Sequence, residues 1–215
     1  PPEKAAPSYV KRLFDGYSEH FDASLERLDY CGPRLAVEAL APWPTQPDWR
    51  ALDLGCGTGL VGVLLRPHCA HLTGIDLSPK MLAVSAGREV YDQLLEADVI
   101  AYLGDHPGEF DAIAGSDVLT YIGDLSEFFP AAAAALRPGG RTAMVLEEAP
   151  HNPRLPGYRL HPTGRYAHQA AYIEQGFAQA GLSVQISREH SMRQECGRPT
   201  PTLTVRAERV ECSPP

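Results

Sequence analysis

The sequence feature that most constrains this chain is the stretch ALDLGCGTGL at residues 51–60. An apolar run there ends in a turn that contains Gly55, Gly57 and Gly59, and a helical pattern follows. Glycine can adopt positive φ angles and lets a ligand approach the backbone closely. A helix that begins at such a turn also presents unpaired N–H groups and the positive end of its dipole. The stretch therefore predicts a strand–turn–helix unit with a ligand-binding bend in an open α/β sheet.

Two ligands fit this predicted bend. The residues Gly57–Gly62 match the pattern G-x-G-x-x-G, which is typical of dinucleotide binding but is a weak signal alone. S-adenosylmethionine (SAM) is the second candidate, and Asp53 favours it. A carboxylate at the end of the strand would repel a pyrophosphate, whereas it would attract the cationic end of SAM. An NAD(P)-dependent oxidoreductase remains the alternative at this point.

Length and charge limit the classes of protein to which this chain can belong. Its 215 residues suffice for one doubly wound domain, and we predict a helical cap over residues 1–48 and the main domain over residues 49–215. There are 19 basic and 27 acidic residues, a net charge of −8, which argues against general binding to nucleic-acid phosphates. No run of about 18 apolar residues predicts a membrane span.

The cysteines and the first residues indicate the setting of the chain. Five cysteines are present, an odd number without a C-x-x-C motif, which favours a reduced, cytoplasmic environment. His68, Cys69 and His71 lie together, but no second ligand pair has zinc-like spacing, so no metal site is expected. No secretory signal opens the sequence, and its start at Pro1 suggests a trimmed or excised domain.

The periodicity of apolar residues predicts alternating strands and helices. Strands are expected at residues 50–54, 71–75, 94–97, 110–115, 141–147, 182–187 and 202–210. Helices are expected at residues 8–22 with Ser8 as N-cap, 33–40, 58–66 and 166–180, after the cap Ser78, and from a capping box at Asp124–Glu127 to Leu136. Residues 148–164 are rich in proline and are expected to be irregular, and a loop of this length is usually functional or disordered.

Carboxylates follow two further predicted strands. Asp76 lies 19 residues after Gly57, an offset typical of an acid that binds ribose hydroxyl groups; a plain helix-entry residue is the alternative. Asp98 is placed to accept a hydrogen bond from an adenine amino group, with helix N-capping as the alternative. We expect further cofactor contacts from residues beside these carboxylates and after the fourth strand, namely Leu77, Met81, Ala97 and Ser116.

The first predicted helix carries an aromatic stripe. Tyr9, Leu13, Tyr17 and Phe21 recur every four residues, and Phe14 widens the stripe. We expect Tyr17, and secondarily Phe14, to close over the methionine end of SAM as part of a mobile lid. An ordinary amphipathic helix that covers the sheet edge is the alternative.

The acceptor site is expected after residues 141–147, because ligands of open α/β sheets lie beyond the carboxyl ends of the strands. The candidate substrate contacts are Tyr158, Arg159 and Arg165. Guanidinium groups bind carboxylates and phosphates through paired hydrogen bonds, so these arginines favour an anionic acceptor. A solvated loop whose arginines only balance neighbouring glutamates is the alternative. The candidate general bases are His161, His168, Asp117 and Tyr121.

Taken in order, Asp53, the three glycines, Asp76 and Asp98 resemble the motifs of the class I SAM-dependent methyltransferases. The turn Arg137–Gly140 is similar to that family's usual turn before its fifth strand. The resemblance implies a Rossmann-like, doubly wound sheet of seven strands whose last strand is antiparallel. It also implies SAM as the cofactor and S-adenosylhomocysteine (SAH) as the product.

The flanking segments are similar to a narrower group. YVKRLFDGYSEHFD at 9–22, GYRLHPTGRYAH at 157–168 and the stretch 193–199 resemble a bacterial subgroup often fused behind tetratricopeptide repeats and similar to the methyltransferase-like 27 proteins. A shared fold does not define a substrate. We therefore expect methylation of an oxygen or nitrogen of a small molecule. A SAM-binding sensor or assembly factor without transfer activity is the other hypothesis, and the sequence leaves the oligomeric state open.

Overall fold

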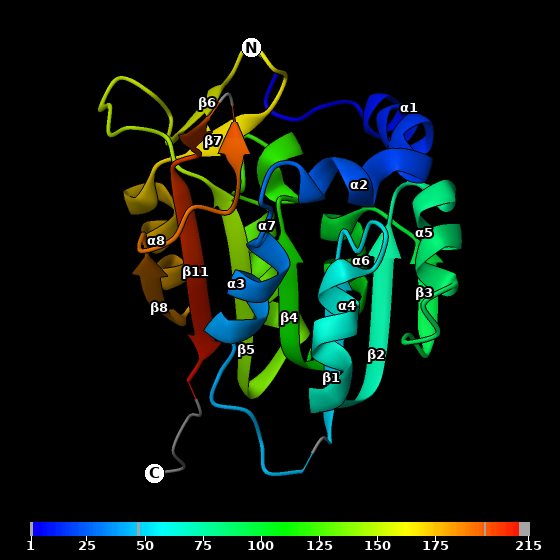
Figure 1. Ribbon diagram of the computed structural model, residues 1–215. Coiled ribbons are helices and arrows are strands. Elements are labelled where there is room, and N and C mark those ends of the chain that lie inside the picture. Colours follow the sequence, from blue (N-terminus) through cyan, green and yellow to red (C-terminus); the bar gives the residue numbers. More distant parts are fainter. Residues whose placement is uncertain (1, 47, 196, 211–215) are drawn as a thin grey trace, which may run out of the picture.

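The computed structural model describes residues 2–46, 48–195 and 197–210. Seven strands of these residues form one sheet in the order β3-β2-β1-β4-β5-β11-β8 (Figure 1). They are β1 (Trp49–Leu54), β2 (Cys69–Asp76), β3 (Gln93–Glu96), β4 (Phe110–Ser116), β5 (Leu136–Glu147), β8 (Leu182–Ser187) and β11 (Thr202–Arg209). β11 runs antiparallel to β5 and β8, whereas β1 to β5 pair in parallel. The predicted Rossmann-like sheet with an antiparallel last strand is confirmed.

The central strands are apolar on both faces because helices cover both faces of the sheet. In β1, Ala51 belongs to the apolar cluster on one face, and Leu52 and Leu54 belong to the cluster on the other. All three side chains are buried, as expected for a parallel strand in the middle of a doubly wound sheet. This packing fixes the point at which the glycine turn leaves the sheet.

Helices α3 (Gly32–Ala39) and α4 (Leu60–Leu65) lie on the front face of the sheet in Figure 1, and α6 (Val99–Asp105), α7 (Phe128–Ala135) and α8 (Ala170–Gln179) lie behind it. α5 (Pro79–Ala86) packs beside β2 and β3 at the sheet edge, and the short 3-10 turns η2 (Arg66–His68) and η3 (Leu119–Tyr121) join neighbouring elements. Within the described residues, no helix combines the length and the apolar character needed to cross a bilayer.

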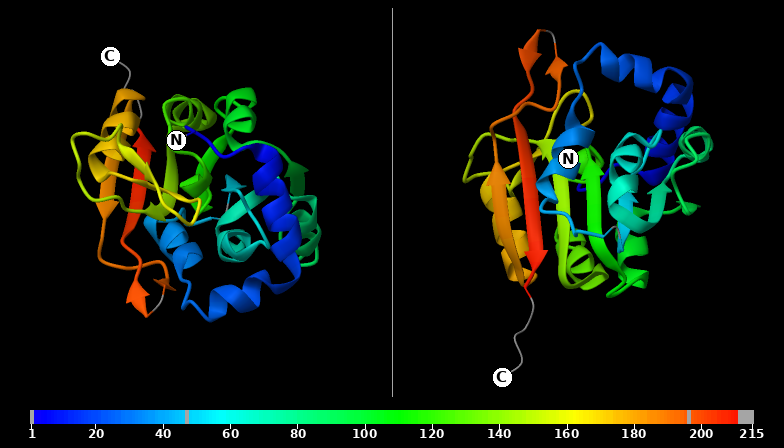
Figure 2. Two further views of the ribbon diagram at one scale, coloured as in Figure 1. Left: turned by 90° about the horizontal axis from the view of Figure 1, so that it is seen from above. Right: turned by 60° about the horizontal axis from the view of Figure 1, so that its bottom comes forward.

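The expected helix at residues 8–22 is divided into α1 (Pro7–Tyr17), η1 (Ser18–His20) and α2 (Phe21–Glu26). Its N-cap is Ala6 rather than Ser8, because Pro7 occupies the first helical turn, where a missing N–H costs nothing. The left view of Figure 2 shows this segment arching over the upper end of the sheet.

Helix α3 lies inside the predicted cap range of residues 1–48 but packs into the core of the sheet. Leu35 and Ala36 share an apolar cluster with Val145 of β5, and Leu40 packs with Ala112 of β4. The helices above the carboxyl edge are therefore α1, η1 and α2. The division of the chain at residue 48 stays a prediction.

The segment expected to be irregular contains a hairpin. Strands β6 (Tyr158–Leu160) and β7 (Tyr166–His168) pair antiparallel, so the prediction of a helix from Tyr166 is wrong for its first turn. The carbonyl oxygen of His168 accepts from the Ala149 amide, and α8 begins only at Ala170. A second small hairpin is formed by β9 (Gln194–Glu195) and β10 (Arg198–Pro199).

Side-chain caps were predicted at the N-termini of two helices, α5 and α7. The Ser78 hydroxyl accepts from the Met81 amide at 3.1 Å, which confirms it as the N-cap of α5. The capping box predicted at Asp124–Glu127 is wrong, because Glu127 occupies the N-cap position of α7 without a side-chain bond. Asp124 instead accepts from the Ser126 amide and the Tyr172 hydroxyl, which closes a local turn.

Candidate functional site

A cavity of about 400 Å³ lies at the carboxyl ends of β1, β2 and β4, beneath α1 and α2. Its size falls within the range of small-molecule pockets. The glycine turn forms its floor, and the first helices form its roof. Of the residues predicted from the sequence, the cavity is lined by Tyr17, Gly55, Gly57, Asp76, Leu77, Asp98, Ser116, Asp117, Tyr121 and Arg165.

The backbone at Gly57 has the form expected of a ligand cradle. Its φ is 54°, a left-handed conformation that favours glycine. A Cβ atom added there would meet only the ring of Phe21, at 3.9 Å, so the space above the turn is open. Gly55, with φ 66°, is required for a different reason, because a Cβ atom there would lie 2.3 Å from Val118.

Asp76 ties the glycine turn to the end of β2. Its Oδ2 accepts from the Gly57 amide at 2.9 Å, and its Oδ1 accepts from the Ser78 amide at 2.8 Å. Burial raises the pKa of this carboxyl, and the bonds from these amides partly offset that rise. The carboxylate faces the cavity with lone pairs left to accept hydroxyl groups, so the expected ribose contact stays a prediction that the geometry allows.

Asp53, which was expected to face the ligand, is directed to Tyr91 in this structure, and its contact with the ligand stays a prediction. Asp53 is 1% exposed and does not line the cavity; its Oδ2 accepts from the Tyr91 hydroxyl at 2.6 Å, on the far side of the turn. Burial raises the pKa of this carboxyl to about 7. The charge argument that favoured SAM over a dinucleotide therefore rests on a residue that does not line this cavity.

Three other predicted cofactor residues also lie outside the cavity lining. Met81 is fully buried in α5, and its backbone amide donates to the Ser78 cap. Ala97 packs against the main apolar cluster. Gly59 is the N-cap residue of α4, and a Cβ atom there would approach Arg88 rather than a ligand.

Asp98 performs the alternative role named for it. Its Oδ1 accepts from the Ile100 and Ala101 amides at 3.0 and 3.3 Å and caps α6. Its Oδ2 accepts from Lys4 at 2.7 Å. Burial alone would raise the pKa of this carboxyl, but the bonds from Lys4 and the amides outweigh it and lower the pKa. The residue still lines the cavity, so the adenine contact stays a prediction.

Aromatic side chains of the first helices close the cavity from above. Phe14 of α1 packs edge-on against Tyr121 at 5.4 Å between ring centroids, and Phe21 lies 6.0 Å from Phe14. Tyr17 lines the cavity while half of its side-chain surface faces solvent. The aromatic stripe thus forms a roof over the glycine turn, and the expected mobile lid stays a prediction.

The same helices are clasped to the glycine turn by side chains that sequence reasoning missed. Asp22 accepts from the Thr58 hydroxyl and from Arg88, both at 2.5 Å, and Asp15 accepts from the Ser78 hydroxyl at 2.6 Å. Thr58 lies between two of the predicted glycines, but nothing in its spacing identified Asp22 as its partner, because the two residues are 36 positions apart.

Asp117 also lines the cavity, and it contacts a residue that was not assigned to the site. Arg193 lies in the loop before β9, is 3% exposed, and its Nη1 lies 2.5 Å from Asp117 Oδ2. Burial raises the pKa of Tyr121 to about 12, and the nearby Asp117 charge adds to that rise. Tyr121 is therefore neutral near pH 7 and suited to donating a hydrogen bond rather than to accepting a proton. The signal for Arg193 was present only in the resemblance of the stretch 193–199.

Four predicted acceptor residues lie outside the cavity. His168 is fully buried, with Nε2 against the carbonyl oxygens of Ile122 and Gly123 at 2.9 and 3.2 Å. Burial lowers the pKa of His168 to about 4, which makes it a structural, neutral histidine. The hairpin carries the others away from the sheet edge: Arg159 is exposed and contacts His161, and Tyr158 packs against Tyr166.

The arginines on which the expected anionic acceptor was based offer no unpaired guanidinium group to the cavity. Arg165 lines the cavity, but its guanidinium lies against Glu147, at 2.8 Å, and Glu195. Arg159 is exposed in β6. Sequence spacing placed these residues on one segment, whereas the hairpin directs only Arg165 inward.

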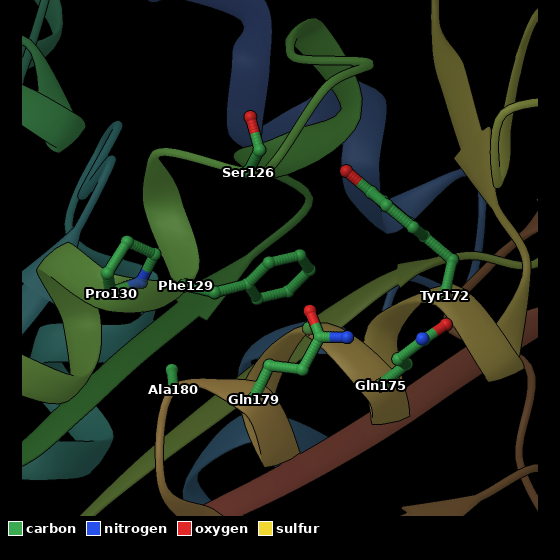
Figure 3. Close-up of a pocket in the computed structure, with 8 residues that line it drawn as sticks. Ser126, Phe129, Pro130, Tyr172, Gln175, Gln179 and Ala180 are labelled. Atoms are coloured by element: carbon green, nitrogen blue, oxygen red, sulfur yellow. The ribbon is translucent and has the colours of Figure 1, made fainter.

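A second pocket, of about 390 Å³, is a groove between α7 and α8 (Figure 3). Phe129 forms its base, and the side chains of Tyr172, Gln175 and Gln179 border it. It shares no lining residue with the cavity at the sheet edge, and none of the predicted site residues lines it.

Comparison with known proteins decides between the two ligands left by the sequence. Residues 52–142 match the family described as "Methyltransferase domain". This segment, 91 of the 215 residues, is similar to SAM-dependent methyltransferase domains. It spans β1 to the middle of β5 and so contains the glycine turn, Asp76, Asp98 and Asp117. The family match therefore supports SAM as the ligand without relying on Asp53.

Curated relatives of the methyltransferase domain act on different acceptors. The chain is 29% identical over 152 residues to the 18S rRNA (guanine(1575)-N(7))-methyltransferase of Saccharomyces cerevisiae, covering 65% of this chain and 54% of that protein. It is 35% identical to the ubiquinone biosynthesis O-methyltransferase of Xylella fastidiosa strain 9a5c, covering 54% and 45%. It is 36% identical to human methyltransferase-like protein 27, covering 50% and 46%. The chain spans about half the length of these relatives.

Solved structures share the fold of the methyltransferase domain over nearly the whole chain. The [4+2]-cyclase SpnF superposes with a TM-score of 0.74 at 16% identity, covering 98% of both chains. The methyltransferase solved in complex with the Trm112 activator of Haloferax volcanii gives a TM-score of 0.71 at 19% identity, covering 92% of this chain and 98% of that one. At such identities the likeness defines the fold alone.

The residues of the cavity fit SAM. The backbone at Gly57 is open to a ligand, and the half-buried carboxylate of Asp76 can accept from hydroxyl groups. Leu77 and the aromatic roof offer apolar contacts. The carboxylate of Asp117 adds a polar group to the lining of the same cavity.

Proposed function

We propose that the whole protein transfers a methyl group from SAM to an oxygen or nitrogen of a small-molecule acceptor. The observation that carries the proposal is the cavity of about 400 Å³ that joins the glycine turn and Asp76 to Asp117 beneath one aromatic roof. A single enclosed space of this kind can hold a cofactor and a small acceptor together. The net charge of −8 speaks against an RNA acceptor, although one relative acts on rRNA.

The residues of the chain would contribute binding, orientation and exclusion of water. We assign the cofactor to the cavity-lining members of the predicted set: Tyr17, Gly55, Gly57, Asp76, Leu77, Asp98 and Ser116. Bound SAM supplies an activated methyl group, so much of the acceleration comes from holding the acceptor atom in line at about 3 Å. Phe14 and Tyr17 would exclude water from above, and Asp117 is the remaining candidate that can hold a proton near the acceptor.

We further propose membership in the subgroup similar to methyltransferase-like 27. The support is the 36% identity to the human protein over 117 residues, together with the flanking segments at 9–22 and 157–168. The buried ring of Tyr166 and the neutral His168 give the second segment a structural role in holding the β6–β7 hairpin.

Calorimetry and an acceptor screen test the proposal. The purified protein is titrated with SAM, SAH and NAD, and SAH formation is then followed with pools of small-molecule acceptors. We expect SAM and SAH to bind, NAD not to bind, and at least one pool to give SAH. Binding of NAD without SAM would overturn the proposal. Binding of SAM with no SAH from any pool would point to a SAM-binding protein without transfer activity.

A further inference from the structure

Asp117 has an unusual backbone and an incompletely paired carboxylate. Its φ is 61°, a left-handed conformation that is uncommon for residues other than glycine, although aspartate and asparagine adopt it more often than most. Such conformations are found at ligand clamps, where the surrounding structure holds the residue in place. Its Oδ2 is bonded to Arg193, whereas its Oδ1 is buried and meets no hydrogen-bond donor among the described residues. A buried acceptor without a donor is costly unless a ligand supplies one.

The charges around Asp117 leave an excess of negative charge. Arg193 pairs with Asp117, with Glu147 at the end of β5, and with Glu195 of β9 at 2.7 Å. Arg165 lies against the same two glutamates. The cluster therefore contains three carboxylates and two guanidinium groups, and both guanidiniums are engaged with carboxylates. A ligand that enters this end of the cavity meets a negative field and a carboxylate oxygen rather than a free cation.

The walls beside Asp117 are apolar and aromatic. Phe14 and Tyr121 meet edge to face above it, and Ile122 and Leu28 also line the cavity. Aromatic faces attract cations, and apolar walls accommodate a hydrocarbon body. Tyr30, whose hydroxyl is bonded to Ser116 at 2.7 Å, closes the side nearest the cofactor residues.

We infer that the acceptor is an amine with an apolar, ring-bearing body, and that Asp117 Oδ1 accepts a hydrogen bond from its amino group. The inference rests on the proposed methyl transfer and names the class of its acceptor. It replaces the anionic acceptor that the arginines suggested in the sequence, because those arginines are either paired or directed outward.

Asp117 can accept the proton that an ammonium acceptor must lose before its nitrogen is methylated. An ammonium acceptor gives one proton to Asp117, which leaves a neutral amine with a lone pair. That nitrogen forms a bond to the methyl carbon while the carbon–sulfur bond breaks, and its electron pair stays on the sulfur of SAH. The product leaves as an N-methylated ammonium ion, and Asp117 returns its proton to water. Burial, partly offset by Arg193, raises the pKa of the Asp117 carboxyl, which makes it a better proton acceptor than an exposed aspartate.

Matched sets of compounds test this inference directly. Each set shares one body and differs only in its end group, as in phenethylamine, phenethyl alcohol and hydrocinnamate. Binding of each compound to the protein–SAH complex is measured by calorimetry, and methyl transfer from labelled SAM is measured separately. Asp117→Asn is the test variant, because asparagine tolerates the left-handed backbone. Asp105→Asn, an exposed carboxylate at the end of α6, is the control.

We expect the amines to bind the SAH complex and to be methylated, and the alcohols and carboxylates to do neither. Asp117→Asn is expected to lower kcat/KM for the amines about 100-fold, with unchanged SAH affinity, and Asp105→Asn to leave both unchanged. Preference for the carboxylate or alcohol members, no binding by any amine, or amine turnover by Asp117→Asn equal to that of the unchanged protein would each overturn the inference. Failure of SAM and SAH to bind at all would instead overturn the proposed function.

Discussion

The hydroxyl group of Tyr91 donates to Asp53 Oδ2 at 2.6 Å, inside the strand–turn–helix unit and behind the glycine turn. The tyrosine fits there because Gly62 and Gly74 leave room for it; a Cβ atom would lie 2.1 Å from Tyr91 at Gly62 and 2.7 Å from it at Gly74. The third glycine of the G-x-G-x-x-G pattern thus serves the packing of Tyr91. Asp53, the first acid of the motif, accepts the hydrogen bond in the same contact.

The burial of Asp53, which raises the pKa of its carboxyl more than the Tyr91 bond lowers it, makes stability depend on pH. The folded-state pKa of Asp53 is about 7, above its ordinary value of 3.8, so the folded protein binds the proton more tightly than the unfolded chain. The free energy of unfolding should therefore fall as pH rises from about 4 to 7, by up to about 4 kcal/mol for this group. Asp53→Asn removes that dependence. In urea unfolding, the free energy of unfolding of the variant minus that of the unchanged protein should be larger at pH 8 than at pH 5. An equal difference at both pH values would contradict the prediction.

His168 is expected to act in the opposite direction. Its folded-state pKa is about 4, below the ordinary 6.5, so the unfolded chain takes up the proton first as pH falls. The free energy of unfolding should fall by up to about 3 kcal/mol between pH 6.5 and pH 4. Because Asp53 masks this trend, we would measure it by comparing Asp53→Asn with Asp53→Asn/His168→Gln. His161→Gln, on the outer hairpin, is the control; the prediction fails if the double variant loses stability with falling pH as steeply as the single one.

Asp76→Ala should weaken SAM binding. The carboxylate faces the cavity, and charge-assisted hydrogen bonds to hydroxyl groups contribute about 1.5–3 kcal/mol. Calorimetry should show the corresponding loss of affinity, with Glu174→Gln on the exposed surface of α8 as the matched control. Thermal unfolding must accompany the titration, because Asp76 also accepts from the Gly57 and Ser78 amides. A folded variant with unchanged SAM affinity would remove Asp76 from the binding site.

The aromatic roof should become more ordered when ligand binds. We expect amide hydrogen exchange across residues 14–21 to slow on addition of SAH, because the ligand fills the space beneath Phe14 and Phe21. Equal protection with and without SAH would mean that α1 and α2 are a plain structural cover.

Asp22→Asn should loosen the aromatic roof, because it removes the carboxylate that holds Thr58 and Arg88. Since this contact is partly exposed, we expect the roof to be held less strongly by about 1 kcal/mol and SAH to be released roughly fivefold faster. Stopped-flow displacement of SAH measures the rate of release.

Much of the cofactor half of the site could be predicted from local sequence. Gly55, Gly57, Asp76 and Asp98 follow directly after strands whose apolar runs are readable, and parallel strands bring their carboxyl ends to one edge. The acceptor half could not be predicted in this way. His161, His168 and Arg159 share one segment with Arg165, but the β6–β7 hairpin divides them between the core, the outer surface and the cavity.

The sequence by itself determined the order of strands and helices, the glycine turn and the acids that follow the strands, because hydrophobic periodicity and turn chemistry are local properties. Only the tertiary structure decided which carboxylates meet the cavity. Asp53 turns to Tyr91, which is 38 positions away, and Asp117 turns to Arg193, which is 76 positions away. Long-range pairs of this kind depend on how β-strands and loops pack around one another, and packing fixes side-chain direction in a way that spacing along the chain does not record.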